Sequence, residues 1–259
     1  MHESENSSPQ PKSNRVIRRE EYDAVLFDLD GVITNTAEVH AACWKKMFDE
    51  YLQNRATQKG EGFRPFDLVT DYRLYVDGKP RFDGVRDFLT SRGIQLPEGS
   101  PDDSSQAETV RGLGNRKNDL VSEIIEEIGV QPYEGSVQFI HQLRRKGFKT
   151  AVVTSSENCT AVLKSAKLDT FFEVRVDGNM IQAQQLAGKP APDTFLVAAK
   201  LLEVEPKRAV VIEDAISGVQ AGCNGNFGLV IGVARQGNTE ELKHHGAQLV
   251  VRDLGELID

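Results

Sequence analysis

Two aspartates separated by one leucine, Asp28 and Asp30, follow an apolar segment that begins at Ala24. The apolar and β-branched residues before the pair, and Gly31 after it, predict a buried strand that ends in a turn. Strand side chains alternate, so both carboxylates are expected on one face of the strand. Two like charges about 4 Å apart repel by about 4 kcal/mol at an effective dielectric constant of about 20. The pair therefore requires a positive charge or a proton that offsets this repulsion.

Polar residues also end two other apolar segments, 148–156 and 208–215. At these ends lie Thr154, Ser155, Glu213 and Asp214. In open parallel sheets, ligands bind at the carboxyl ends of the strands. Lys189, in the stretch AGKPAPDTF, stands directly before a helix that opens with proline. We therefore expect three polar strand ends and one lysine to converge on a single crevice.

Strand-like and helix-like segments alternate along the chain from Glu21 onward. The predicted strands are 24–30, 148–156, 172–176, 208–215, 227–233 and 247–251, and the predicted helices are 38–51, 135–147, 158–167, 192–203, 216–222 and a short one near His244. Strands that are apolar along most of their length, each followed by a helix, indicate a parallel sheet covered on both faces. The predicted fold class is therefore α/β, with a doubly wound parallel sheet.

The interval from about residue 53 to 131 interrupts this alternation. It contains helical patterns at 84–93 and 118–129, a polar loop at 96–108, and no convincing strand. We interpret it as a mostly helical module inserted after the first strand. The predicted organisation is a disordered tail over 1–20, an α/β core over 21–38 and 132–259, and a helical cap over 39–131.

Composition excludes several classes of protein. The 259 residues are 39% hydrophobic and 27% charged, which is ordinary for a globular protein, and the net charge of −8 argues against a nucleic-acid partner. No segment approaches the length of a membrane span, and the chain start lacks the apolar core of a signal peptide. The three cysteines, Cys43, Cys159 and Cys223, are odd in number and far apart. These features predict a cytoplasmic protein.

Four motifs together resemble those of the haloacid-dehalogenase superfamily of phosphotransferases. They are FDLDGVITNT, a strand ending in TSS, GKPAPD and EDAISG, in that order, and the resemblance covers residues 22 to 232. The stretch FDLDGVITNTAEVHAACW and the RKND of the insert resemble the β-phosphoglucomutase group most closely. The resemblance implies a Rossmann-like core with an inserted α-helical cap.

Phosphoryl transfer needs a nucleophile, a proton donor for the leaving oxygen, and positive charge near the transferring group. Asp28 is the candidate nucleophile, which would form an aspartyl-phosphate. Asp30 would protonate the leaving oxygen and later deprotonate the acceptor. Lys189 would add positive charge, and Thr154 and Ser155 would donate hydrogen bonds to the same phosphate.

A hard divalent cation would offset the repulsion between the carboxylates. Asp28 and Asp214 supply oxygen ligands, and Mg²⁺ suits them better than Ca²⁺ because it retains waters and accepts phosphate oxygen. The resemblance implies that the main-chain carbonyl of Asp30 joins them, with Glu213 binding directly or through water. An alternative role for Glu213 is to brace Lys189 or a helix end.

Residues of the insert and of the second strand end are expected around the substrate. They are His40, Trp44, Arg86, Lys117, Asn118, Ser155, Ser156 and Asn158. His40 and Trp44 are four residues apart and so share a helix face; the resemblance implies that this face, Lys117 and Asn118 meet the substrate, and places Arg86 near a phosphate-binding arginine. Ser156 and Asn158 have an alternative role as helix caps.

The predicted function is a Mg²⁺-dependent phosphotransferase that interconverts sugar 1- and 6-phosphates, with a sugar-phosphate phosphatase as the closest alternative. A dehalogenase also uses an aspartate nucleophile, but it has no leaving oxygen for Asp30 to protonate. A non-catalytic domain associated with a carbohydrate enzyme is a third alternative, and the complete set of charged residues argues against it. The sequence predicts a small-molecule partner, no nucleic-acid or membrane partner, and is compatible with a monomer.

Overall fold

The computed structural model describes residues 17–235 and 237–259. Its centre is a six-stranded sheet in the order β3-β2-β1-β4-β5-β6, in which every neighbouring pair is parallel. The strands are β1 (Ala24–Phe27), β2 (Lys149–Val153), β3 (Val174–Val176), β4 (Ala209–Glu213), β5 (Leu229–Val233) and β6 (Leu249–Val251). The predicted doubly wound α/β class is confirmed, because β1 lies in the middle and the strand order reverses beside it.

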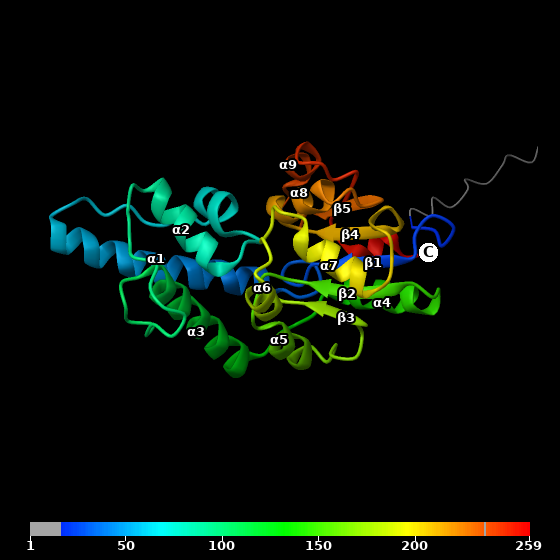
Figure 1. Ribbon diagram of the computed structural model, residues 1–259, viewed down its shortest axis with the longest axis horizontal. Helices are drawn as coiled ribbons and strands as arrows, with labels where there is room; N and C mark the ends of the chain where they lie inside the picture. Colours follow the sequence, from blue (N-terminus) through cyan, green and yellow to red (C-terminus); the bar gives the residue numbers. More distant parts are fainter. Residues whose placement is uncertain (1–16, 236) are drawn as a thin grey trace, which may run out of the picture.

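Helices cover both faces of this sheet (Figure 1). The core helices are α4 (Glu134–Arg145), α5 (Cys159–Ser165), α6 (Gly178–Gln184), α7 (Asp193–Leu201), α8 (Ile216–Asn224) and α9 (Thr239–His244), with short 3₁₀ helices η2 (Pro206–Arg208) and η3 (Leu254–Leu257). Strand alternation divides β1 between two apolar layers. Val25 and Phe27 pack with α4, α5 and η3, whereas Ala24 and Leu26 pack with α7, α8 and α9.

The insert between β1 and β2 is helical. It comprises α1 (Thr36–Lys59), a π-helical turn η1 (Tyr72–Val76), α2 (Arg81–Ser91) and α3 (Val110–Ile128). Figure 1 shows these helices beyond one end of the sheet, and they have an apolar core of their own. Phe48 lies at its centre, with ring centroids 4.2 Å from Phe88, 5.2 Å from Phe66 and 5.3 Å from Trp44. A core independent of the sheet lets this insert hold side chains over the strand ends.

Some helix boundaries differ from the predicted ones. The helix predicted over 38–51 runs to Lys59, because Leu52 and Ala56 are also buried, and Gly60 ends it in a left-handed conformation (φ 66°). The helix predicted from residue 118 begins at Val110, after Thr109 accepts a hydrogen bond from Gly112 N. The elements α6 and η1 were not predicted, whereas residues 96–108 form the predicted loop.

The predicted disordered tail lies mostly outside the described residues, which exclude 1–16. Residues 17–20, however, form a turn in which Ile17 packs on the core and Tyr22 N donates to Arg18 O. Within the described ranges, no helix combines the length and apolar character that crossing a membrane requires.

Candidate active site

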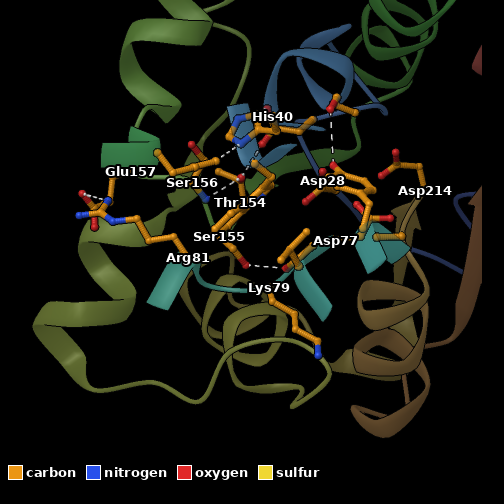
Figure 2. Close-up of a pocket in the computed structure, with 18 of the residues that line it drawn as sticks. Asp28, His40, Asp77, Lys79, Arg81, Thr154, Ser155, Ser156, Glu157 and Asp214 are labelled. Carbon is orange, nitrogen blue, oxygen red and sulfur yellow. Dashed lines mark hydrogen bonds and ion pairs between the residues drawn. The ribbon is translucent and has the colours of Figure 1, made fainter. Parts of the chain in front are cut away.

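Asp28 and Asp30 lie just beyond β1 and line a cavity between the sheet and the insert. Figure 2 shows this cavity with Asp28 among its labelled residues. The backbone N–H of Asp28 donates to Ile212 O at 2.9 Å, which extends the pairing of β1 with β4 by one residue. Gly31 then turns the chain with a φ of 86°, a conformation that glycine adopts without strain. Thr154 and Asp214, from the two strands beside β1, line the same cavity, so the predicted convergence of strand ends is observed.

Lys189 supplies a positive charge directly beneath the nucleophile candidate. Its Nζ lies 2.6 Å from Asp28 Oδ1 and 2.6 Å from Glu213 Oε1, and it donates to Val153 O at 3.2 Å. Burial alone would lower the pKa of Lys189, but the two carboxylates outweigh that effect and raise its pKa. Lys189 is therefore a buried ammonium that uses all three protons in hydrogen bonds.

Asp28, Glu213 and Asp214 form a carboxylate cluster in which one oxygen from each lies within 4.8 Å of the others. Burial, followed by the charges of Asp77 and Glu213, raises the pKa of Asp214 well above its usual value. Glu213 already accepts hydrogen bonds on both oxygens, from Lys189 and from Ala215 N. This donor set, with more negative charge than Lys189 offsets, fits a hard divalent cation.

Asp30 is held as a carboxylate. Its Oδ1 accepts a hydrogen bond from Thr36, its Oδ2 accepts from Thr154 Oγ1 at 3.1 Å, and His40 Nε2 lies 3.4 Å from Oδ1. Burial would raise the pKa of Asp30, but His40, the Thr36 hydroxyl and the charge of Lys117 together lower it below its usual value. In this arrangement Asp30 is ready to accept a proton.

Three residues of the insert reach Asp30 as a chain of contacts. Lys117 Nζ lies 2.6 Å from His40 Nδ1 and 5.0 Å from the ring centroid of Trp44. Burial lowers the pKa of Lys117 to about 8, and burial together with Lys117 lowers the pKa of His40. A neutral His40 that accepts at Nδ1 carries its proton on Nε2, facing Asp30.

The hydroxyl residues after β2 take different positions. Thr154, Ser155 and Ser156 line the cavity, with Ser156 N donating to the Thr154 hydroxyl at 3.1 Å. Asn158 is not among the lining residues; its amide donates to Asn118 Oδ1 at 3.0 Å and so joins the core to α3. Asn118 itself lines the cavity, in the middle of α3 and not at its start as predicted.

Arg86 does not reach the cavity. It lies on α2 with its guanidinium paired to Glu98 at 3.0 Å and to Asp83, and its side chain is 41% exposed. The family resemblance had placed it near a phosphate-binding arginine. Arg81, five residues earlier on the same helix, lines the cavity instead; five helical residues separate the two side chains by about 7.5 Å along the axis.

The segment 77–81, missed by the sequence argument, forms one wall of the cavity (Figure 2). Arg81 Nη1 lies 2.5 Å from Glu157 Oε2, and its Nε is buried without a hydrogen-bond partner among the described residues. Lys79 Nζ instead donates to Asp87 Oδ2 at 2.6 Å and does not pair with the carboxylates of Asp28 or Asp214. Because Arg81 Nη2 donates to Asn115 Oδ1 at 3.1 Å, Nε is the guanidinium nitrogen of Arg81 that is left to meet an anion.

Two serine hydroxyls of the core dock this segment onto the sheet. Ser217 Oγ donates to Asp77 O and Ser155 Oγ donates to Gly78 O, both at 2.7 Å. Gly78 has a φ of 70°, and a Cβ there would lie 2.4 Å from Ser217 Oγ and 3.0 Å from the Ala215 Cβ. The close approach of the insert to the core at this point requires glycine.

Gly78→Ala is expected to lower kcat/KM by about 100-fold, because the added methyl group displaces the segment from its serine partners. The matched control is Gly147→Ala, at which φ is 78° but nothing lies within 4 Å of the new Cβ. Both variants bear the cost of the left-handed backbone, about 1–2 kcal/mol. Melting temperature and steady-state rates separate them: equal activity of the two variants would contradict the docking role of Gly78.

The residues that line the cavity lie within the part of the chain that is similar to known proteins. A family model described as haloacid dehalogenase-like hydrolase matches residues 22–225. The chain is 50% identical over 253 residues to a β-phosphoglucomutase of Mycobacterium bovis, covering 96% of this chain and 97% of that one. It is 30% identical to the β-phosphoglucomutase of Bacillus subtilis, over 90% and 91% of the two chains. A solved β-phosphoglucomutase from Clostridium difficile has a TM-score of 0.69 at 28% identity, covering 92% of this chain and 93% of that one.

Proposed function

The chain belongs to the haloacid dehalogenase-like hydrolase family, and from that membership we propose that it is a phosphotransferase interconverting sugar 1- and 6-phosphates. Half of its residues are identical to those of a protein named β-phosphoglucomutase over almost the whole length. The observation that carries the proposal is the cavity in which Asp28, paired with Lys189, faces Asp30 under the inserted helices. We infer that the chain is an enzyme and not a non-catalytic domain, since its charged residues converge in this one place.

Asp28 is the proposed nucleophile. Its carboxylate oxygen attacks the phosphorus of the sugar phosphate, and the bond from phosphorus to the sugar oxygen breaks. Lys189 keeps Asp28 oriented through their 2.6 Å contact and adds positive charge beside the transferring group. The product of this half-reaction is an aspartyl-phosphate on Asp28 and a free sugar hydroxyl.

Asp30 is the proposed acid and base. Asp30 is a carboxylate in the free site, so the proton it gives to the leaving sugar oxygen as the aspartyl-phosphate forms is the one it took from the attacking hydroxyl of the preceding turnover. In the second half-reaction, a different sugar hydroxyl attacks the phosphorus, its proton passes to Asp30, and the bond to Asp28 breaks. The contacts from Thr36, Thr154 and His40 hold the carboxylate in place for both transfers.

We propose Mg²⁺ as the cation, held by Asp28, Asp214 and the main-chain carbonyl of Asp30. When bound, it would neutralise negative charge on the oxygens of the transferring phosphoryl group. Glu213 contributes mainly through Lys189, because both of its carboxylate oxygens already accept hydrogen bonds. Thr154 and Ser155 line the cavity, and their hydroxyls donate to Asp30 and to Gly78 O, so the backbone N–H of Ser155 is the group that we propose as a donor to the phosphate.

A mutase must transfer phosphate to a sugar hydroxyl while water is excluded, and the docked insert supports that proposal. The insert closes over the carboxylates through the serine contacts to Asp77 and Gly78. Lys79, Arg81 and Lys117 line the insert side of the cavity; since Lys79 is paired with Asp87, we propose Lys117 and Arg81 for a second phosphate group. A bisphosphate held in this way can present either phosphate to Asp28.

The function is tested by incubating the protein with Mg²⁺, β-glucose 1-phosphate and a trace of glucose 1,6-bisphosphate. We expect glucose 6-phosphate to form faster than inorganic phosphate. Release of phosphate without isomer, across several aldose phosphates, would instead establish the alternative, a sugar-phosphate phosphatase. The proposed roles of Asp28 and Asp30 are common to both outcomes.

Arg81→Met is expected to reduce isomerisation on the order of 10- to 100-fold, the cost of one lost charge-assisted hydrogen bond to a phosphate. Arg86→Met is its matched control, since it makes the same chemical change on the same helix outside the cavity. It should retain activity within about twofold, the usual range for a surface substitution. Rates and KM for the bisphosphate are measured for both variants. A larger loss in Arg86→Met would return the phosphate-binding role to the residue predicted from the sequence.

A further inference from the structure

Arg235, two residues beyond β5, contacts the loop that follows Asp30. Its Nε donates to Gly31 O at 2.7 Å, and its Nη2 donates to Val32 O at 3.1 Å. Its Nη1 lies 2.7 Å from Asp253 Oδ2, so the guanidinium is held from the opposite side by an ion pair. One side chain thus joins the end of β5 and the segment before η3 to the turn after β1.

The surroundings of Arg235 fix it further. Its Cζ lies 3.4 Å from the ring centroid of Tyr133, and its Nη2 also donates to Ser136 Oγ at 3.1 Å. The fully buried Ser136 in turn donates to Val32 O at 2.7 Å. The Val32 carbonyl therefore accepts from two side chains that also bond each other, which is a rigid arrangement.

The loop that Arg235 holds touches two of the residues assigned to the chemistry. Gly31 directly follows Asp30, so the peptide group between them carries the Asp30 carbonyl proposed as a cation ligand. A Cβ on Gly31 would lie 1.9 Å from Asp214 Oδ2, so the backbone of Gly31 is in contact with that carboxylate. Arg235, Gly31 and Asp214 also line a second cavity, which shares Asp214 with the first. A shift of Gly31 would therefore displace Asp30 and Asp214 together.

We propose that Arg235 is a positioning residue: by holding the carbonyl oxygens of Gly31 and Val32, it fixes Asp30 and Asp214 relative to each other. It does not line the cavity that holds Asp28 and Asp30, and it acts through the backbone of the loop. Its effect on turnover rests on the proposed function, whereas its effect on the carboxylates does not.

Arg208 offers a matched control at the other end of β1. It pairs with Asp23, with Nη2 2.9 Å from Oδ1, and its Nη1 donates to Glu20 O at 3.2 Å. Arg208→Met therefore removes the same kind of contact, a guanidinium bonded to a carboxylate and to a backbone carbonyl. It does so far from the carboxyl ends of the strands.

The test compares Arg235→Met, Arg235→Lys and Arg208→Met with the wild type. Mn²⁺ affinity is measured by electron paramagnetic resonance without substrate, together with melting temperature, kcat and KM. Arg235→Met is expected to bind Mn²⁺ about 10- to 100-fold more weakly, and to lose kcat by a similar factor with little change in KM. Arg235→Lys should recover part of both losses, because an ammonium can reach one carbonyl but lacks the planar fork.

Arg208→Met should bind Mn²⁺ as tightly as the wild type, even if its melting temperature is lower. Wild-type Mn²⁺ affinity and kcat in Arg235→Met would overturn the proposal. The proposal would also be overturned if both variants lost Mn²⁺ affinity and kcat in proportion to their fall in melting temperature. Arg235 would then have a structural role only. If the wild type binds Mn²⁺ but turns over no sugar phosphate, the proposed function fails, and the Mn²⁺ comparison alone decides the role of Arg235.

Discussion

Asp28→Asn is expected to reduce turnover on the order of 10⁴- to 10⁶-fold, the usual cost of removing a covalent nucleophile. The asparagine amide is neutral and does not attack phosphorus, so no phosphoenzyme can form. Lys189 would also lose one of its two carboxylate partners, at 2.6 Å, while its contact with Glu213 keeps it in place. The variant should therefore remain folded.

The measurement is the mass of the intact protein after brief exposure to glucose 1,6-bisphosphate. The wild type should acquire a phosphoryl group and Asp28→Asn should not. Asp177→Asn is the control, because Asp177 caps α6 through Met180 N and asparagine caps a helix equally well. A phosphorylated Asp28→Asn protein would show that the acceptor is another residue.

The fold could be predicted because its strands are unambiguous. Every residue of β1 is fully buried, so the sequence from Ala24 to Phe27 is continuously apolar, as expected for a central strand of a parallel sheet. Helix ends were less predictable. The end of α1 depends on the burial of Leu52 and Ala56, a tertiary property with no local signal.

The core of the candidate site could be predicted for a geometric reason. The carboxyl ends of neighbouring parallel strands lie at the same edge of the sheet. The predicted strands therefore had to bring together Asp28, Thr154 and Asp214. His40 and Trp44 share a helix face for an equally simple reason, their spacing of four. In both cases regular backbone geometry converts sequence positions into spatial ones.

Arg81 could not be predicted by the same reasoning. The chain between α1 and α2 is a long loop containing a π-helical turn, and no periodic pattern there relates a residue number to a direction in space. The docking of this segment depends on Ser217, far along the chain. The position of α2 relative to the sheet is a tertiary property, so the family resemblance indicated Arg86, which lies outside the cavity.

Asp30→Asn is expected to lower kcat on the order of 100- to 10,000-fold, the usual contribution of a general acid or base. The asparagine oxygen can still accept a hydrogen bond from Thr36 or Thr154, so the loop should keep its shape. Cation affinity should change little, because only the main-chain carbonyl of Asp30 is proposed to bind the metal. Mn²⁺ affinity measured beside kcat therefore distinguishes a lost proton transfer from a damaged cation site.

The leaving group provides the sharper comparison. A sugar oxygen needs a proton as its bond to phosphorus breaks, whereas para-nitrophenolate leaves without one. Asp30→Asn should therefore form the phosphoenzyme from para-nitrophenyl phosphate at nearly the wild-type rate, yet form it slowly from a sugar phosphate. If Asp30→Asn instead reacted with the sugar phosphate as fast as the wild type, the proton donor would be His40, which lies 3.4 Å from Asp30. That outcome would transfer the acid–base role from Asp30 to His40, and an equal loss with both phosphate donors would assign Asp30 a structural role.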